Sequence, residues 1–168
     1  MTEVSVWTDG SCLHNGKTDA VSGIGVYYEK GDPRNYSSYL KSEKQTNNRA
    51  ELVAILYAIV MDFNSNNLSI HSDSKLSINC VTTYSTRWRV NGWMTSKGAP
   101  VESQEIIKCI VEAIETRAQL GLRTTLKHVK AHSGEVNNDA ADKIAKAAAS
   151  TKIEGGRMSL IRLCGFPV

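Results

Sequence analysis

The stretch Val4-Ser5-Val6-Trp7-Thr8-Asp9-Gly10 decides how the rest of the chain can be arranged. Its apolar and polar side chains alternate, which predicts a half-buried β-strand that ends in a carboxylate. An acidic side chain held at the end of a strand suits catalysis or metal binding. Because Asp-Gly is also a common hairpin signal, an ordinary turn stays open as the interpretation of this stretch alone.

The residues that follow predict a meander and then a buried helix. Residues 21–28 and 36–41 are expected to form two further strands, antiparallel to the first. Gly23 and Gly25 mark a bend or a close backbone approach in the second strand. A helix is expected to begin near residues 46–51 and to continue to Met61. Its nearly continuous apolar sequence indicates burial against the sheet.

Another strand follows that helix and again ends in an aspartate. A right-handed crossover would place residues 68–73 parallel to the first strand, with Asp73 beside Asp9 at the same end of the sheet. The sequence therefore predicts a mixed α/β sheet with acids at one edge. The remaining predicted elements are helices at residues 75–84, 103–120 and 138–149 and a strand at residues 124–130.

Composition predicts one globular domain. Of the 168 residues, 41% are hydrophobic and 22% charged, and the net charge is +3, which is too small to indicate a polyanionic partner. No apolar run has the length of a membrane span, and no secretory signal is evident. We expect a cytoplasmic or otherwise intracellular monomer without membrane contact. Reduced thiols are expected at all four cysteines, Cys12, Cys80, Cys109 and Cys164, which lack metal-binding spacing.

Four acids, Asp9, Glu51, Asp73 and Asp142, lie at or near the edges of apolar elements. Each has an ordinary alternative. Glu51 can interact with a helix dipole, Asp73 can cap the next helix, and Asp142 can pair with Lys146. If the four converge, their charges repel one another and lose hydration. A divalent cation offsets that cost, and oxygen ligands favour Mg²⁺ or Mn²⁺ over zinc.

Four short motifs resemble, in order, the motif series of type 1 ribonuclease H. Any one of them is a weak signal, whereas the ordered set is specific and extends through Ala149. The motifs are Thr8-Asp9-Gly10-Ser11-Cys12, Thr46-Asn47-Asn48-Arg49-Ala50-Glu51-Leu52, Ser72-Asp73-Ser74, and His128-Val129-Lys130-Ala131-His132-Ser133-Gly134 with the predicted helix 138–149.

The resemblance implies a ribonuclease H-like fold and a nuclease activity. The fold would be a five-stranded mixed sheet flanked by helices, with strands 1–3 in an antiparallel meander and strands 4 and 5 parallel to strand 1. Residues 1–150 would form the catalytic domain. It would hydrolyse the RNA strand of RNA/DNA hybrids with two Mg²⁺ ions per site, which Mn²⁺ can replace. The products would carry 5′-phosphate and 3′-hydroxyl ends.

The resemblance also assigns roles to individual residues. Asp9 matches the acid that bridges the two metals, Glu51 and Asp73 match the ligands of one metal, and Asp142 matches a ligand of the other. His132 matches the family's mobile catalytic histidine, although a lone histidine is more often an ordinary surface residue. Histidine side chains exchange protons near neutral pH, which suits release of a proton or product.

Substrate-binding residues follow from the same comparison. Gly10, Ser11, Cys12, Asn15 and Asn48 match positions at which the family contacts RNA. Asparagine can donate and accept hydrogen bonds, as recognition of a 2′-hydroxyl requires. Asn15-Gly16 is equally compatible with an ordinary turn.

The contacts to the DNA strand match the family less well. Lys44 and Thr46 are expected in its DNA-phosphate pocket, where Ser103 replaces an asparagine. Trp88 matches an aromatic residue of the basic protrusion that packs on DNA, but Tyr84 replaces a tryptophan and the segment is weakly basic. The expected partner is an RNA/DNA hybrid.

Several alternatives remain open at this point. A nuclease or strand-transfer enzyme acting on DNA would use a similar sheet but generally lacks the Asn-Arg-Ala-Glu helix start. A non-catalytic hybrid-binding module would not need all four acids. Residues 151–168 form a tail of unknown role, whose apolar residues either pack on the domain or bind a protein partner.

Overall fold

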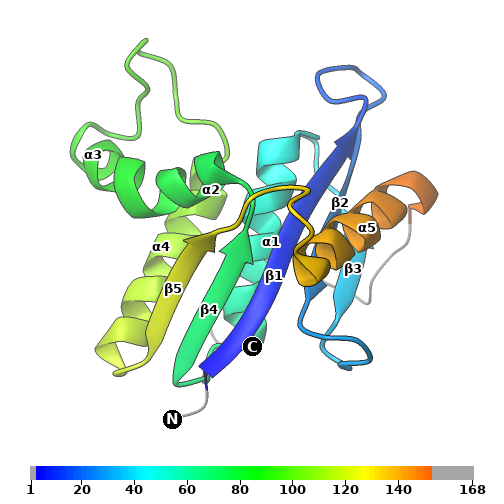
Figure 1. Cartoon of the computed structure of the whole chain (residues 1–168). Helices are drawn as coiled ribbons and strands as arrows, with labels where there is room; N and C mark the ends of the chain where they lie inside the picture. The colour runs from blue at the N-terminus through cyan, green and yellow to red at the C-terminus, as the bar shows by residue number, and fades with distance from the viewer. Residues whose placement is uncertain (1–2, 153–168) are drawn as a thin grey trace.

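The computed structural model describes residues 3–152, which form a five-stranded mixed sheet flanked by helices (Figure 1). The strand order is β3-β2-β1-β4-β5. β1 pairs antiparallel with β2 and parallel with β4, and β5 pairs parallel with β4. The predicted meander and parallel crossover are therefore confirmed. The strands are β1 (Glu3–Leu13), β2 (Val21–Tyr27), β3 (Tyr36–Tyr39), β4 (Asn67–Ser72) and β5 (Arg123–His128).

Helices cover both faces of the sheet. α1 and α4 lie together on one face, and α5 crosses the other face over β1 and β2 (Figure 1). The hydrophobic core lies between the sheet and the α1–α4 layer. The helical elements are α1 (Asn47–Met61), α2 (Lys75–Asn79), the π-helical segment η1 (Cys80–Tyr84), α3 (Ser85–Val90), α4 (Gln104–Gln119) and α5 (Val136–Thr151).

β1 is longer than the sequence predicted. Its parallel pairing with β4 ends at Thr8 and Ser72, whereas its antiparallel pairing with β2 continues to Leu13. Asp9 therefore lies within β1, at the point where β4 has ended, and not at the end of the strand. Gly10 belongs to the strand as well, so the interpretation of Asp9-Gly10 as a hairpin turn is wrong.

α1 is the central helix of the core. Its residues from Arg49 to Ile59 are all buried, as its apolar sequence predicted. Thr46 caps the helix, and its hydroxyl oxygen accepts a hydrogen bond from the backbone nitrogen of Arg49 at 3.2 Å. This cap fixes where the helix begins and therefore places Glu51 in its second turn.

The helix predicted at residues 75–84 continues without interruption to Val90 in three segments, α2, η1 and α3. The wider η1 turn interrupts the regular α-helical repeat, which a periodicity argument does not detect. Of the basic and aromatic stretch that follows Ser85, the residues up to Val90 are therefore helical.

Gly23 and Gly25 allow α5 to lie directly on β2. A β-carbon built at Gly25 would lie 2.3 Å from the backbone oxygen of Ala141 in α5, and one at Gly23 would lie 2.3 Å from that of Ala145. The prediction of a close backbone approach is confirmed. Because the contacts are to backbone, no side-chain rotation can relieve them.

We expect Gly25→Ala to destabilise the protein by about 1–3 kcal/mol, because the added methyl group forces α5 away from β2. Urea unfolding measures the change in the free energy of unfolding. Ser37→Ala is the control, since Ser37 lies opposite Gly25 in β3 and the change adds no atoms. A Gly25→Ala protein as stable as this control would contradict the packing argument.

The cysteines differ from the prediction. Cys12 and Cys80 are free thiols, but Cys109 is disulfide-bonded, so the expectation of four reduced cysteines is wrong for Cys109. Sequence spacing does not report which residues approach each other in space, and disulfide formation depends on that approach. Cys164 and the predicted tail beyond Lys152 lie outside the described residues. In the part of the chain that the structure describes, no helix is long and apolar enough to cross a membrane.

Candidate active site

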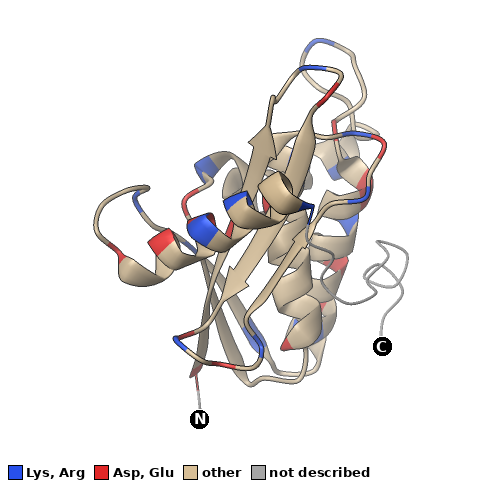
Figure 2. Cartoon of the chain, turned by 90° about the vertical axis from the view of Figure 1, so that its right-hand side faces the viewer, with Lys and Arg blue, Asp and Glu red and all other residues tan. Residues whose placement is uncertain are grey.

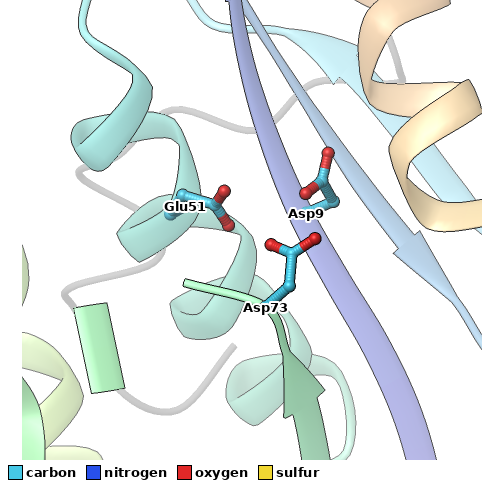
Figure 3. Close-up of side chains that lie close together, drawn as sticks. All are labelled: Asp9, Glu51 and Asp73. Carbon is cyan, nitrogen blue, oxygen red and sulfur yellow. The ribbon is translucent and has the colours of Figure 1, made fainter. Parts of the chain in front are cut away.

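Three carboxylates that are distant in sequence meet where β4 ends beside the middle of β1. Asp9 comes from β1, Glu51 from α1, and Asp73 from the residue directly after β4. One ligand atom from each lies within 4.8 Å of the others, and the three side chains point toward one another (Figure 3). The structure therefore brings together three of the four acids that the sequence singled out.

Close backbone packing holds two of these acids together. A β-carbon at Gly10 would lie 2.2 Å from the backbone nitrogen of Glu51. Only glycine leaves room for α1 to approach β1 so closely at this point. Glycine next to Asp9 thus determines the distance between the Asp9 and Glu51 carboxylates, and it is not a turn residue.

Because the cluster is buried, ionising all three of its carboxyl groups at once costs free energy. Asp9 and Glu51 are only 4% and 3% exposed. Burial, followed by the charges of Asp73 and Asp142, raises the pKa of Asp9 to about 8. Burial and the charges of Asp9 and Asp73 likewise raise the pKa of Glu51 well above its ordinary value. The cluster therefore retains protons at neutral pH unless a cation compensates its charge.

The cluster fits a divalent cation. All of its ligand atoms are carboxylate oxygens, which hard cations such as Mg²⁺ and Mn²⁺ prefer. Among the described residues, Glu51 Oε2 is buried and has no hydrogen-bond partner. A buried carboxylate oxygen without a partner is rare in folded proteins, and coordination of a cation would satisfy it.

Asp142 approaches the cluster from α5. It lies outside the three-carboxylate group, but a side-chain hydrogen bond and the charge of Asp142 both contribute to the raised pKa of Asp9. Lys146 Nζ donates to Asp142 Oδ2 at 2.7 Å, one helical turn away. Figure 2 shows the acidic positions of α5 toward its N-terminal end and the basic positions farther along the helix. Asp142 is therefore adjacent to the cluster and engaged by Lys146.

The predicted RNA-contacting residues lie beside the acids. Asn47 Oδ1 accepts a hydrogen bond from the backbone nitrogen of Cys12 at 3.2 Å, and Asn15 Oδ1 accepts one from that of Asn47 at 3.3 Å. Ser77 Oγ donates to Asn48 Oδ1 at 3.0 Å. These bonds join the end of β1, the start of α1 and α2 into one ordered edge. Gly10 and Ser11 lie in β1 between Asp9 and this edge.

The two residues expected in a phosphate pocket lie just before α1. Lys44 lines a pocket of about 360 Å³ that also includes Ser103, and Thr46 caps α1 through its hydrogen bond with Arg49, another lining residue. Arg49 extends into this pocket, where it donates to Glu105 Oε1 at 2.6 Å and to Ser103 Oγ at 3.2 Å. The Arg49 guanidinium therefore provides a second positive charge in this pocket beside Lys44, and the sequence did not indicate this role for Arg49.

Trp88 belongs to an aromatic cluster at the edge of the core. Its ring lies 5.6 Å from that of Tyr84 and 6.0 Å from that of Trp93. Trp88 and Trp93 pack against the core in part, while Tyr84 is 40% exposed. Lys108 Nζ lies 4.8 Å from the centre of the Trp93 ring. Tyr84 is therefore the more exposed neighbour of Trp88.

Among the described residues, no hydrogen bond connects His132 to the acids. It is exposed, in the loop between β5 and α5, and its backbone is left-handed with φ of 52°. No hydrogen bond joins it to Asp9, Glu51 or Asp73 within residues 3–152. Its predicted catalytic role stays a prediction.

Comparison with known proteins identifies the family. The ribonuclease H family model matches residues 1–150, which include every site residue described above. The chain belongs to the ribonuclease H family.

Curated relatives and solved structures agree with this assignment. A ribonuclease H of Schizosaccharomyces pombe is 41% identical over 86% of this chain and 52% of its own length. Ribonuclease HI of Pasteurella multocida is 32% identical over 88% of this chain and 90% of its own length. The chain thus spans about half the length of the yeast relative. The foamy viral protease-reverse transcriptase in complex with RNA/DNA hybrid superposes with a TM-score of 0.72, at 21% identity over 88% of this chain and 20% of that chain.

The structure of this ribonuclease H family member adds Asn138 to the site. Asn138 is 2% exposed, and its Nδ2 donates to Asp73 Oδ2 at 3.0 Å. The sequence carried one usable signal for this residue, because Asn138 precedes Asp142 by four positions and therefore lies on the same helix face.

The raised pKa values predict how pH affects stability without metal. A native carboxyl with a raised pKa keeps its proton while the unfolded chain loses it, so stability falls as pH rises from the ordinary Asp value of 3.8 to about 8. With a chelator present, we expect the free energy of unfolding to fall by on the order of 1 kcal/mol per pH unit in this window.

Urea unfolding at pH 5 and pH 8, with EDTA or with Mg²⁺, measures this dependence. We expect Mg²⁺ to flatten the decline, because a bound cation favours the ionised acids. Asp9→Asn should also flatten it, since that side chain cannot ionise. If the free energy of unfolding with EDTA fell as steeply with pH in Asp9→Asn as in the unmodified chain, groups other than Asp9 would be the cause.

Proposed function

We propose that this chain is an endonuclease that hydrolyses the RNA strand of RNA/DNA hybrids by a two-metal-ion mechanism. The observation that carries the proposal is the meeting of Asp9, Glu51 and Asp73 within 4.8 Å, beside an edge that carries asparagines. Membership of the ribonuclease H family supports the reaction, and a solved relative is described in complex with an RNA/DNA hybrid.

Each acid has a role as a ligand in this proposal. Asp9, Glu51 and Asp73 would hold one Mg²⁺ or Mn²⁺ ion, and Asp9 and Asp142 would hold a second. Two such ions would supply an activated water and stabilisation of the leaving oxygen in an in-line displacement at phosphorus. The protein holds its ligands rigidly because they come from a strand, a helix and a strand end. We expect the products to carry 5′-phosphate and 3′-hydroxyl ends.

The residues that select the RNA strand lie beside the acids, at the edge formed by the end of β1 and the starts of α1 and α2. Gly10, Ser11 and Cys12 offer backbone and small side chains to the wide, shallow groove of a hybrid, where 2′-hydroxyls are exposed. Asn15 and Asn48 hold their amide groups in fixed positions through the hydrogen bonds described above. A pre-ordered amide can recognise a hydroxyl without a further loss of side-chain entropy.

The DNA strand would lie on the other side of α1. Lys44 and Arg49, which line one pocket, provide positive charge for a phosphate, although Glu105 neutralises part of it. Trp88, with Tyr84 beside it, offers an aromatic surface for the sugars. The +3 net charge of the chain indicates weak, salt-sensitive binding to nucleic acid.

His132 moves a proton in this proposal. Its exposed loop position leaves it accessible to solvent, and histidine exchanges protons near neutral pH. We expect it to assist departure of the proton or of the cleaved product. Residues 1–150 form the catalytic domain in this view.

Cleavage of end-labelled substrates tests the proposal. We expect cutting of the RNA strand in an RNA/DNA hybrid with Mg²⁺ or Mn²⁺, and no cutting of a DNA duplex, an RNA duplex or single-stranded RNA. Treatment of the products with phosphatase and ligase identifies their ends. Intact hybrid RNA with either metal would reject the proposal, and cutting of the DNA duplex would favour a DNA-acting enzyme.

A further inference from the structure

Asn138 is a polar residue of the candidate site that is as deeply buried as the acids Asp9 and Glu51. It lies in the first turn of α5 and is 2% exposed. Its Nδ2 donates to Asp73 Oδ2 at 3.0 Å, so it connects α5 to the end of β4. This is a side-chain hydrogen bond between two elements that are 65 residues apart in the sequence.

The orientation of the amide group follows from its partner. An ionised carboxylate only accepts hydrogen bonds, so the amide nitrogen must face Asp73 and the amide oxygen must point elsewhere. That oxygen, Oδ1, is buried and has no hydrogen-bond partner among the described residues. A buried acceptor without a donor is costly, and it marks a place where a donor is expected.

Helix geometry gives the contact a second consequence. Asn138, Asp142 and Lys146 follow one another at intervals of four residues and therefore share one face of α5. Lys146 donates to Asp142 at 2.7 Å, and this hydrogen bond, together with the charges of Asp142, Asp9 and Asp73, raises the pKa of Lys146. This face of α5 is thus turned toward the acids, and Asn138 connects its first turn directly to Asp73.

We propose that Asn138 is a positioning residue of the cation site. Its amide nitrogen holds the Asp73 carboxylate in the orientation that a cation requires, and its amide oxygen accepts a hydrogen bond from a water that enters with the cation. The residue also holds α5, and hence Asp142, at a fixed distance from Asp73. This inference rests on the proposed function, because it assigns a metal to the acids.

Cation binding in the absence of nucleic acid provides the decisive measurement. Asn138→Leu has a similar volume but cannot make either hydrogen bond, and we expect it to weaken Mg²⁺ binding about tenfold in calorimetry, as loss of a hydrogen bond to a metal ligand typically does. Asn138→Ala removes the same bonds without added bulk and should give a similar loss. Asn137→Ala, in the same turn, is the control and should bind Mg²⁺ as the unmodified chain does.

Two further measurements distinguish positioning from a general structural role. Hybrid binding without divalent cations, followed by fluorescence anisotropy, should change less than about twofold in Asn138→Leu and Asn138→Ala. In an Asp73→Ala background, Asn138→Leu should cause no additional loss of Mg²⁺ binding, because the residue acts through Asp73.

Unchanged Mg²⁺ affinity in both Asn138 variants would overturn the inference, as would an equal loss in the Asp73→Ala background. A loss of hybrid binding as large as the loss of Mg²⁺ binding would indicate a structural role and overturn it as well. Failure of the proposed function is distinguishable, because it appears as intact hybrid RNA with the unmodified chain.

Discussion

Asp9→Asn is expected to abolish hydrolysis of hybrid RNA while leaving hybrid binding nearly unchanged. Asp9 lies within 4.8 Å of both Glu51 and Asp73 and is 4% exposed, so its carboxylate is one of the three that a cation would contact. In the proposed two-metal mechanism, loss of a ligand shared by both ions would forfeit several kcal/mol of transition-state stabilisation, which corresponds to a rate loss on the order of 10³-fold or more. Single-turnover cleavage measures the rate, and fluorescence anisotropy measures binding.

The same substitution should stabilise the metal-free protein at pH 8, because a neutral amide replaces a buried carboxyl that resists ionisation. Asp32→Asn is the matched control, since Asp32 pairs with Arg34 in the turn between β2 and β3. It should cleave at the rate of the unmodified chain. If Asp9→Asn retained more than about a tenth of that rate, the metal assignment would be untenable.

Arg117→Met is expected to cause the largest loss of stability outside the site. Arg117 is fully buried in α4, and its guanidinium donates to the backbone oxygens of Asp62 at 2.9 Å, Ser65 at 2.7 Å and Arg123 at 3.1 Å. It also donates to the backbone oxygen of Phe63. Methionine fills a similar volume but leaves these acceptors without a donor.

We expect that change to lower the free energy of unfolding by roughly 3–5 kcal/mol, because each unsatisfied buried acceptor costs about 1–3 kcal/mol and part of the cost relaxes. Urea unfolding measures it. Arg89→Met is the control, since the Arg89–Glu115 pair is about half exposed and such pairs contribute less than about 1 kcal/mol. Equal losses in the two variants would show that the Arg117 hydrogen bonds are not the cause.

The sequence predicted the sheet well because its signals are local. Alternating strands, an apolar helix and a crossover require only short-range patterns and a handedness rule, and they placed Asp9 beside Asp73. The length of β1 escaped prediction because Asp9-Gly10 is locally identical to a turn signal. Its true role depends on α1, whose backbone at Glu51 leaves room only for glycine at position 10.

The sequence predicted the acids of the site because they lie at or near the ends of strands and helices. It did not predict residues whose role depends on contacts with other elements of the fold. The only local signal that separates Asn138 from Asn137 is its spacing of four residues from Asp142, and the hydrogen bond to Asp73 follows from the fold alone. Thr46 was predictable in its local role, because its hydroxyl oxygen accepts the helix-cap hydrogen bond that the sequence indicated. That bond leaves the hydroxyl proton available to a phosphate, and its place in the phosphate pocket stays a prediction. The disulfide at Cys109 likewise depends on distances that spacing does not encode.

The π-helical segment η1 accommodates one extra residue without turning the helix that follows it. A π-turn holds one more residue than an α-turn, so deletion of one residue within Cys80–Tyr84 would restore a regular helix. Because the wider turn already absorbs that residue, side chains beyond the deletion would keep nearly the same direction, whereas a deletion within a regular α-helix rotates them by roughly 100°. Trp88 would therefore stay on its side of the molecule although the chain before it were one residue shorter. In this segment the fold tolerates a change of length that a regular helix does not.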